Sequence, residues 1–527
     1  MTIQQIQLTS YDTVVAVTQN SINEMLATFL DGLQKNVALY YTADAEGNFV
    51  PTTPDAAVFT FTGTLGYAVE NGAPVNIVQL YNEGQPQTVR YNITFGNAEF
   101  KSISVPPFDV KQSGNEPWII GFLVNLALKE VSPESLPANV RQAVSRYVGQ
   151  LSPDMFSIQQ LYLDLNTAAF DTFQNIENMP DLAATLLSGI MRVYLKQQQA
   201  QGGTIFGYTL HSTAANQQPP TFMPTALDFC VTPYTDATGN HSNPGLDTLN
   251  YLLMTDHRPL PPNPPSGFGF NWVDDNSVQG TMAVRHDLIL NYLIPHFNGI
   301  LQTISPTVNA NAKHDKVTFG QGSGTNSFTM HNPPLSGNVV ADYSYKESGK
   351  DSHTTGSGVT TIVSSHYSSN CRITFNGDTI HVSGTITCSA SEIVSSSETD
   401  NETDMPATTY AWYADLRLQM NLADNGSLDI VVVDSDFDSP PTVAGHDLKW
   451  WQKVIEGFGG GMTQYVKDFG GLQGDVQTNL DAVLPAIKSV LSTTNDFVFP
   501  GANTFAFKNP QFSDDLDLAS NITYLST

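Results

Sequence analysis

The residues best suited to metal chemistry are two histidines and a run of alternating aspartates. His286 and His296 stand ten residues apart, nearly three turns of a helix, which argues against one metal ion held by both imidazoles. Asp434, Asp436 and Asp438 alternate in the sequence DSDFD, and carboxylates with this spacing could share a Ca²⁺ ion. The glycine and the twelfth-position glutamate of an EF-hand loop are absent, so a solvated strand end is the preferred interpretation. The sequence therefore predicts no metal site.

Motifs of common catalytic centres are absent as well. The chain has no HExxH helix, Walker A loop, CxxC pair or GxSxG turn. Glycine runs occur at 320–324 and 457–461, but neither has the strand–turn–helix setting that phosphate binding requires. We therefore expect a protein that is not an enzyme, with no catalytic residues and no cofactor.

The remaining pattern that could bind a ligand is apolar, and it lies on three predicted helices. Each carries apolar residues at three- and four-residue spacing, which places them on one helix face. Ser21 and Glu24 form a capping box at the start of the first helix, and Pro295 predicts a kink in the second. The three faces comprise Ile22, Met25, Leu26, Phe29, Leu30 and Leu33; then Val284, Leu288, Ile289, Tyr292, Leu293 and Ile300; and finally Leu480, Val483, Leu484, Ile487, Val490 and Leu491.

Strands are predicted between these helices, where apolar residues alternate with polar ones. Polar segments at 311–337, 347–358 and 391–403 are interpreted as mobile loops. The alternating segments are 59–61, 91–95, 161–165, 339–345, 371–375, 380–388, 412–422 and 428–433.

Turn signals set the expected register of two hairpins. A two-residue Asn-Gly turn at 376–377 pairs Ile373 with Ile380 and keeps the apolar residues on one face. A later three-residue loop, Asp-Asn-Gly, pairs Met420 with Ile430 for the same reason. Both sheets are therefore predicted to be antiparallel with one buried face.

Composition limits the partners and the compartment. Of 527 residues, 50 are acidic and 22 are basic, which gives a net charge of −28 and disfavours binding to nucleic acid or to anionic membranes. Three cysteines are too few for a disulfide framework. The polar N-terminus lacks a secretory signal, and the most apolar stretch, 118–128, is shorter than the roughly 20 residues of a membrane helix. We expect a soluble protein without a transmembrane segment, made in the cytoplasm, with any export by a non-classical route.

Five segments of the chain resemble one protein family: YDTVVAVTQNSINEML, PWIIGFLVNLALKE, FSIQQLYLDLN, LDTLNYLLMT and FVFPGANTFAFKNPQFSDDLDLASNITY. The family is the clostridial toxin-cluster family of the forty-seven-kilodalton protein encoded beside OrfX-type botulinum neurotoxins. It resembles the tubular lipid-binding (TULIP) superfamily, in which a highly curved antiparallel sheet wraps a long helix. The resemblance spans nearly the whole chain and rests on hydrophobic and aromatic blocks. It implies binding of lipid or another apolar small molecule, a role in a toxin-associated or insecticidal system, and toxin-cluster proteins as partners.

The order of elements and the resemblance together predict the architecture. We expect an α+β, TULIP-like fold of two tandem modules, with long amphipathic helices wrapped by highly curved antiparallel β-sheets. The first module occupies 1–258, a Pro/Gly-rich loop occupies 259–275, and the second module, with its C-terminal helices, occupies 276–527.

Two functions remain open. In the first, the protein is a non-enzymatic carrier or sensor whose helices and sheets enclose an apolar tunnel, where each buried methylene of a lipid contributes about 0.8 kcal/mol. In the second, the core is dry and the protein is a structural or interaction component of a toxin or particle assembly. The residues expected to line the tunnel are Met25, Phe29, Leu33, Ile289, Tyr292 and Leu293.

Overall fold

The computed structural model describes residues 3–31, 35–66, 69–70, 73–74, 76–80, 85, 87–104, 106–136, 138, 141, 156–200, 204–212, 224–263, 265–314, 316–320, 326–421, 427–437, 442–443, 474–488, 497–498 and 504–525. The chain forms two compact units. Unit 1 comprises Met1–Val284, Asn495–Lys508 and Ala519–Thr527, and unit 2 comprises Arg285–Thr494 and Asn509–Leu518.

Unit 1 is built on one large sheet, whose described pairs are antiparallel. Its strands are β1 (Thr13–Thr18), β2 (Lys35–Ala43), β3 (Phe49–Pro51), β4 (Phe59–Gly66), β7 (Val78–Gln79), β8 (Thr88–Ser102), β9 (Phe108–Lys111), β10 (Trp118–Val131), β11 (Phe156–Gln174), β12 (Thr204–Ser212), β13 (Ala226–Thr232), β14 (Thr248–Met254), β15 (Gly280–Val284), β25 (Phe497–Val498), β26 (Thr504–Phe512) and β27 (Leu518–Leu525). They follow the order β13-β14-β1-β15-β27-β26-β25-β12-β11-β10-β8-β4-β2-β3, with β7 and β9 on β8.

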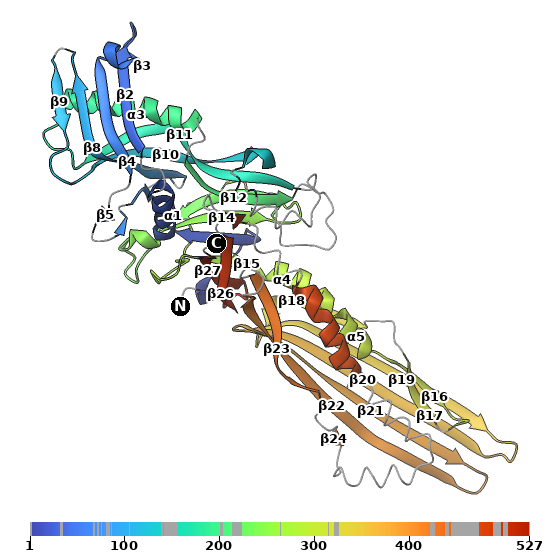
Figure 1. Ribbon diagram of the computed structural model, residues 1–527. Coiled ribbons are helices and arrows are strands. Elements are labelled where there is room, and N and C mark those ends of the chain that lie inside the picture. The colour runs from blue at the N-terminus through green and yellow to red at the C-terminus, as the bar shows by residue number, and fades with distance from the viewer. Residues whose placement is uncertain are drawn as a thin grey trace. The chain divides into compact units, whose positions relative to one another are not determined.

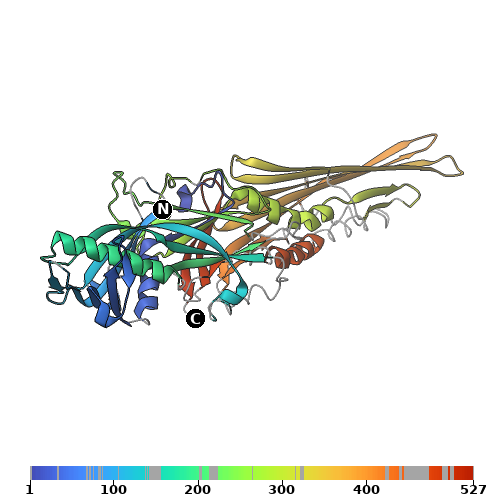
Figure 2. The ribbon, with the colours of Figure 1, turned by 90° about the horizontal axis from the view of Figure 1, so that it is seen from above.

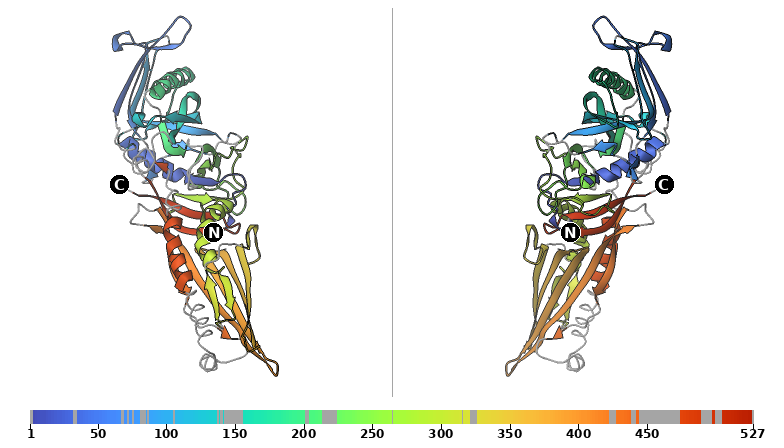
Figure 3. Two further views of the ribbon diagram at one scale, coloured as in Figure 1. Left: turned by 90° about the vertical axis from the view of Figure 1, so that its right-hand side faces the viewer. Right: turned by 90° about the vertical axis from the view of Figure 1, so that its left-hand side faces the viewer.

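Two helices accompany this sheet. Helix α1 (Gln19–Asp31) follows β1 directly, and α3 (Asp181–Ala200) packs on β11 and β3. Figure 3 shows α3, in green, beside the blue strands of the same unit. The shorter elements are β5 (Val69–Glu70), β6 (Ala73–Pro74) and the 3₁₀ turns η1 (Ile3–Gln5), η2 (Pro54–Ala56), η3 (Pro133–Ser135) and η5 (Pro244–Leu246).

Unit 2 combines a sheet of long antiparallel strands with short helices. The sheet has the order β18-β19-β20-β21-β22-β23, and β24 pairs with β22. Figures 1 and 2 show the helices on one face of these strands. The elements are α4 (His286–Leu293), η6 (Ile294–Phe297), α5 (Asn298–Thr303), β16 (Thr307–Asn311), β17 (Lys316–Gly320), β18 (Ser327–Leu335), β19 (Val339–Thr354), β20 (Thr360–Asn376), β21 (Thr379–Ser395), β22 (Asp400–Asn421), β23 (Ser427–Asp436), β24 (Thr442–Val443) and a helix at 474–488.

The two faces of the unit 2 sheet differ, because burial alternates along its strands. We call the face toward the helices the inner face and the opposite one the outer face. Strand register aligns the inner-face residues across neighbouring strands. The buried residues of the inner face include Tyr343, Tyr345, Val363, Tyr367, Ser369, Cys371, Ile373, Phe375, Ile380, Val382, Ile386, Cys388, Tyr410, Trp412, Ala414, Leu416 and Leu418.

The expected domain division does not match these units. The segment 259–275 is not a linker between domains, because Trp272 and Val273 are buried in the core of unit 1. The C-terminal strands β25 to β27 add to the unit 1 sheet, so 276–527 does not form one module. The two units are therefore interleaved in sequence rather than tandem.

The expectation of curled antiparallel sheets is confirmed, but the helices differ from the expected ones. The second helix is interrupted at Pro295, where the sequence predicts a kink. The 3₁₀ turn η6 there separates the short helices α4 and α5. Helix 474–488 is present, while Val490 and Leu491 lie outside the described residues. Helix α3 was not anticipated. Thr18 rather than Ser21 caps α1, because the Ser21 amide donates to Thr18 Oγ1 at 3.2 Å.

The expected loops of unit 2 are largely strands. Strands β16, β17 and β18 lie within or beside 311–337, while β19 extends to Thr354 and β21 to Ser395. Their Ser- and Thr-rich sequences lack apolar alternation because much of each strand faces water. Threonine nevertheless favours strands, and pairing with neighbouring strands provides hydrogen bonds for the backbone N–H and C=O groups.

Both hairpins are shifted by two residues from the expected register. Asn376 pairs with Thr379, so the turn begins at Gly377, which has a φ of 58°, and Ile373 pairs with Val382. In the other hairpin, Ile430 pairs with Leu418, whereas the expected partner was Met420. A shift of two leaves each side chain on its expected face, which explains why the burial pattern was anticipated and the partners were not.

Candidate functional site

Helix α4 contains two of the expected tunnel residues, and both are buried in the core of unit 2. Ile289 and Leu293 are one helical turn apart and are buried, as are Leu288, Leu290 and Ile294 nearby. The inner face of the sheet supplies many aromatic side chains. This helix–sheet layer is the part of unit 2 in which an apolar ligand would have to lie.

Hydrogen bonds fasten the segment after α5 to the inner face. The hydroxyl of Tyr367 donates to the carbonyl oxygen of Ile304 at 3.1 Å, and Ser369 Oγ donates to the same carbonyl. Ser305 Oγ is hydrogen-bonded to the hydroxyl of Tyr343 and donates to a carbonyl of α5 at 2.6 Å. Burial raises the pKa of Tyr367, so its hydroxyl stays protonated at neutral pH. We call this set the tyrosine cluster.

Helix 474–488 covers another part of the inner face. Asn479 Nδ2 donates to Thr303 Oγ1 at 2.5 Å, which ties this helix to α5. Lys488 Nζ lies 3.0 Å from Asp429 Oδ1 on β23. The buried residues of this helix are Val476, Leu480, Val483 and Ile487, while Leu484 is partly buried.

Unit 1 has a corresponding helix–sheet layer under α3. The ring of Tyr194 lies 6.4 Å from that of Phe95, which contacts Phe61 edge-on at 4.8 Å between centroids. Gly189 faces the ring of Phe49, and a Cβ at this position would clash with it. Glycine therefore allows the Phe49 ring of β3 to pack closely on α3, and a larger residue would displace that ring. The buried residues of α3 are Ala183, Leu187, Ile190, Met191, Tyr194 and Leu195.

The expected lining residues are divided between the two units. Met25 in α1 is partly exposed, whereas Ile289 and Leu293 in α4 are buried. Phe29 lies in α1 and Tyr292 in α4, and Leu33 falls outside the described residues. The lining set stays a prediction. Sequence reasoning missed the face of α3 and the tyrosine cluster, although α3 carries apolar residues at helical spacing after Pro180.

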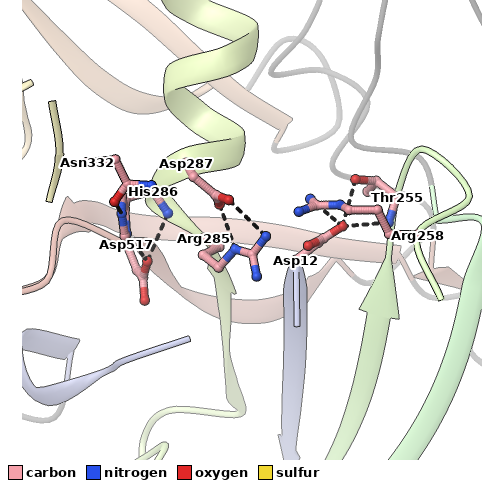
Figure 4. Close-up of polar contacts among 8 residues, drawn as sticks. All are labelled: Asp12, Thr255, Arg258, Arg285, His286, Asp287, Asn332 and Asp517. Carbon is pink, nitrogen blue, oxygen red and sulfur yellow. Dashed lines mark hydrogen bonds and ion pairs between the residues drawn. The ribbon is translucent and has the colours of Figure 1, made fainter. Parts of the chain in front are cut away.

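A polar cluster at the N-terminus of α4 involves one of the histidines considered for metal binding. Asp517 Oδ1 accepts the backbone N–H of His286 at 2.8 Å and lies 3.2 Å from its Nδ1, while Asn332 Oδ1 lies 3.0 Å from Nε2 (Figure 4). The hydrogen bond with Asp517 raises the pKa of His286, desolvation opposes this, and Asn332 adds to it. An imidazolium can donate to both oxygens, so the cluster favours the protonated ring. Its role is to cap the helix.

A second polar cluster, in unit 1, is buried. Asp12 Oδ2 accepts hydrogen bonds from the backbone N–H and the hydroxyl of Thr255 at 2.8 and 2.9 Å, and Arg258 Nη2 lies 2.6 Å from it (Figure 4). The Asp12 side chain is fully buried, and a buried carboxylate of this kind requires such partners. The cluster joins the residue before β1 to the turn after β14, which is a structural role.

The described residues offer little for catalysis or metal binding. Within them, no three side chains of His, Cys, Asp or Glu are grouped so that they could hold a metal ion. In the DSDFD segment, Asp434 accepts a hydrogen bond from Tyr413 at 3.2 Å, and Asp438 lies outside the described part of the chain. Burial raises the pKa of the Cys371 thiol to about 12, which leaves little nucleophilic thiolate at neutral pH. Cys230, Cys371 and Cys388 form no disulfide.

No helix in the described part of the chain combines the length and the apolar composition needed to cross a bilayer.

Comparisons with known proteins add little to this picture. No protein-family model and no curated protein matches the chain. Among solved structures, it is similar to the crystal structure of a lipopolysaccharide binding protein, with 9% identity over 98% of this chain and 100% of that chain and a TM-score of 0.30. A TM-score this low does not establish a shared fold. Membership of the toxin-cluster family accordingly stays a prediction, and the function has to be argued from this chain.

Proposed function

We propose that this protein is a non-enzymatic binding protein for lipid or another apolar ligand, of the tubular lipid-binding type. One observation carries the proposal: amphipathic helices lie with their apolar faces on the aromatic-rich side of curled antiparallel sheets. A small separation between such layers creates an apolar channel, in which each methylene of an acyl chain contributes about 0.8 kcal/mol. No polar motif is needed for that affinity.

The layer under α4 and helix 474–488 is the proposed location in unit 2. Its helices are short and are joined to each other and to the sheet by a few polar contacts, including Asn479 with Thr303 and Lys488 with Asp429. Short helices can move as separate pieces, whereas one long helix would have to move as a whole. Ile289 and Leu293 would then contact the ligand directly.

The second candidate function is a structural component with a dry core. The tyrosine cluster favours it, because hydrogen bonds from Tyr367 and Ser369 hold the chain after α5 firmly on the sheet. A dry core would leave the function to the surface of the protein.

Native mass spectrometry of gently purified full-length protein tests the first candidate. Bound lipid would appear as extra mass that organic extraction removes, and an acyl-chain fluorophore would then bind to the extracted protein. Absence of both the extra mass and fluorophore binding would refute the proposal.

Substitution of Leu293 by Trp separates the two candidates further. If a channel lies beside Leu293, the larger ring fills it, displaces the ligand and leaves stability nearly unchanged. In a dry core the same change overpacks the site and costs about 1–3 kcal/mol. Asn291→Ala, on the exposed side of α4, is the matched control and should alter neither ligand content nor stability.

We also propose a role beside toxin proteins. This proposal rests on the family resemblance and not on the fold. Affinity purification of the tagged full chain from producing cells should recover a toxin-type protein. Recovery of no such partner would argue against the toxin association, whatever the result of the lipid experiment.

A further inference from the structure

The outer face of the unit 2 sheet contains a hollow of about 720 Å³. This volume is within the range of roughly 300–1,000 Å³ found for small-molecule sites. Strand register aligns one row of its side chains across all six strands from β18 to β23. The row consists of Thr329, Asp342, Arg372, Ser383, Tyr413 and Asp436.

A second row lies two residues along the same strands. Ser327, Ser344, Asn370 and Thr385 occupy successive positions on β18 to β21. Hydroxyl groups both donate and accept hydrogen bonds, and the amide of Asn370 presents a donor beside an acceptor. The hollow therefore offers closely spaced donors and acceptors along two parallel lines.

Arg372 and Asp342 are paired with each other in the hollow, and Asp436 adds a second carboxylate at the β23 end. Asp342 lies 2.9 Å from Arg372 Nε and 3.1 Å from His331 Nε2. His381 Nδ1 lies 2.6 Å from Asp415 Oδ1. Asp415, Asp434 and Asp436 all lie near Tyr413, so this end of the hollow is acidic and disfavours a polyanion. Carboxylates accept hydrogen bonds from hydroxyl groups, so the hollow complements an uncharged ligand rich in hydroxyls.

An aromatic pair completes the hollow at β21 and β22. The rings of His381 and Tyr413 are stacked, with centroids 5.8 Å apart and planes inclined by 28°. The Tyr413 hydroxyl donates to Asp434 at 3.2 Å, which holds its ring in place. A flat aromatic face beside carboxylate, amide and guanidinium groups suits a sugar ring, which has C–H groups on one face and hydroxyls at its edge.

We infer that the outer hollow binds an uncharged oligosaccharide chain that lies across the strands. The occupant follows from the carboxylate acceptors, the two polar rows and the stacked rings. The two rows lie on the opposite face of the sheet from the layer proposed for the apolar ligand, and the intervening inner-face residues Tyr343, Cys371 and Trp412 also line the hollow. Glycan binding and lipid binding are measured separately, so either proposal can fail without the other.

Binding of the full-length protein to immobilised uncharged glycans, followed by calorimetry with a soluble oligosaccharide of the preferred type, tests the inference. At least one uncharged glycan should bind. Asn370→Ala and Tyr413→Ala should each weaken binding by about tenfold or more, since each removes a main contact. Tyr413→Phe keeps the ring and should retain most of the affinity. Ser368→Ala, on the same face of β20 but outside the hollow, should have no effect.

Circular dichroism and thermal unfolding of every variant establish that the fold is intact, and Asn370→Ala is the safest because its side chain is exposed. Three outcomes would overturn the inference: no uncharged glycan binds, the variants bind as well as the parent, or heparin or oligolysine is preferred over every uncharged glycan.

Discussion

The inner and outer faces of the unit 2 sheet share the same strands and differ in almost everything else. On β20, Phe375 is fully buried on the inner face, while its neighbour Thr374 is on the outer face. The inner face contributes to stability through burial of aromatic rings, and the outer face presents polar and charged groups. One set of strands can therefore support a core and a binding surface with separable energetics, because successive side chains point to opposite faces.

The largest expected difference between the faces comes from Phe375. Its ring is stacked on that of Phe512, with centroids 4.2 Å apart. Phe375→Ala should lower the free energy of unfolding by about 3–5 kcal/mol, since it leaves a cavity in the core. Thr374→Ala should change it by only about 0.5 kcal/mol or less. Urea unfolding measures both, and equal effects of the two substitutions would contradict the comparison.

The tyrosine cluster gives the next largest effect. Ser369→Ala and Tyr367→Phe each remove one donor to the Ile304 carbonyl and should each cost about 1 kcal/mol. The double variant should cost more than the sum of the two, because the buried carbonyl then loses both donors. An additive double-mutant cycle from denaturant unfolding would show that the two hydroxyls act independently.

The His286 cluster predicts a pH dependence of smaller size. Because the folded-state pKa of His286 is raised above 6.5, its contribution to stability is complete below that value and is lost as the pH rises through the raised pKa. Denaturation midpoints across this range should therefore fall more in the parent protein than in His286→Gln. His314→Gln changes an exposed histidine and serves as the control. Identical pH profiles for the parent and His286→Gln would rule out this contribution.

The outer-face ion pair should have the smallest effect on stability. Burial raises the pKa of Asp342, but hydrogen bonds from Arg372 and His331 outweigh it and leave the pKa below its ordinary value. Its contribution is present above the ordinary carboxyl pKa and lost as the pH falls. With Arg372 58% exposed, Arg372→Met should change stability by about 0.5 kcal/mol or less at neutral pH, and by less again in acid. A larger loss of stability on this substitution would show that the outer face also stabilises the fold, and would contradict the difference between the two faces.

Residue patterns anticipated much of the secondary structure for a physical reason. The period of apolar residues depends only on local geometry, so α1, α4 and helix 474–488 and strands such as β4, β8 and β20 could be predicted. The burial of Ile289, Leu293 and Leu480 followed from the same periods. Helix α3 carries a comparable signal after Pro180 and was not predicted. The polar strands carry no such sequence signal, because a strand with water on both faces does not require apolar residues to alternate with polar ones.

The sequence by itself therefore determined which faces of helices and strands are apolar, the acidic balance of the chain, and the absence of HExxH, Walker A, CxxC and GxSxG motifs. Only the tertiary structure decided which strands pair: the C-terminal strands return to unit 1, and two hairpins shift by two residues. It alone aligned Asp342, Arg372 and Tyr413 from three strands in one row of the outer hollow. Such sites depend on the register between segments far apart in the chain, and register is set by the packing of the whole sheet rather than by any local pattern.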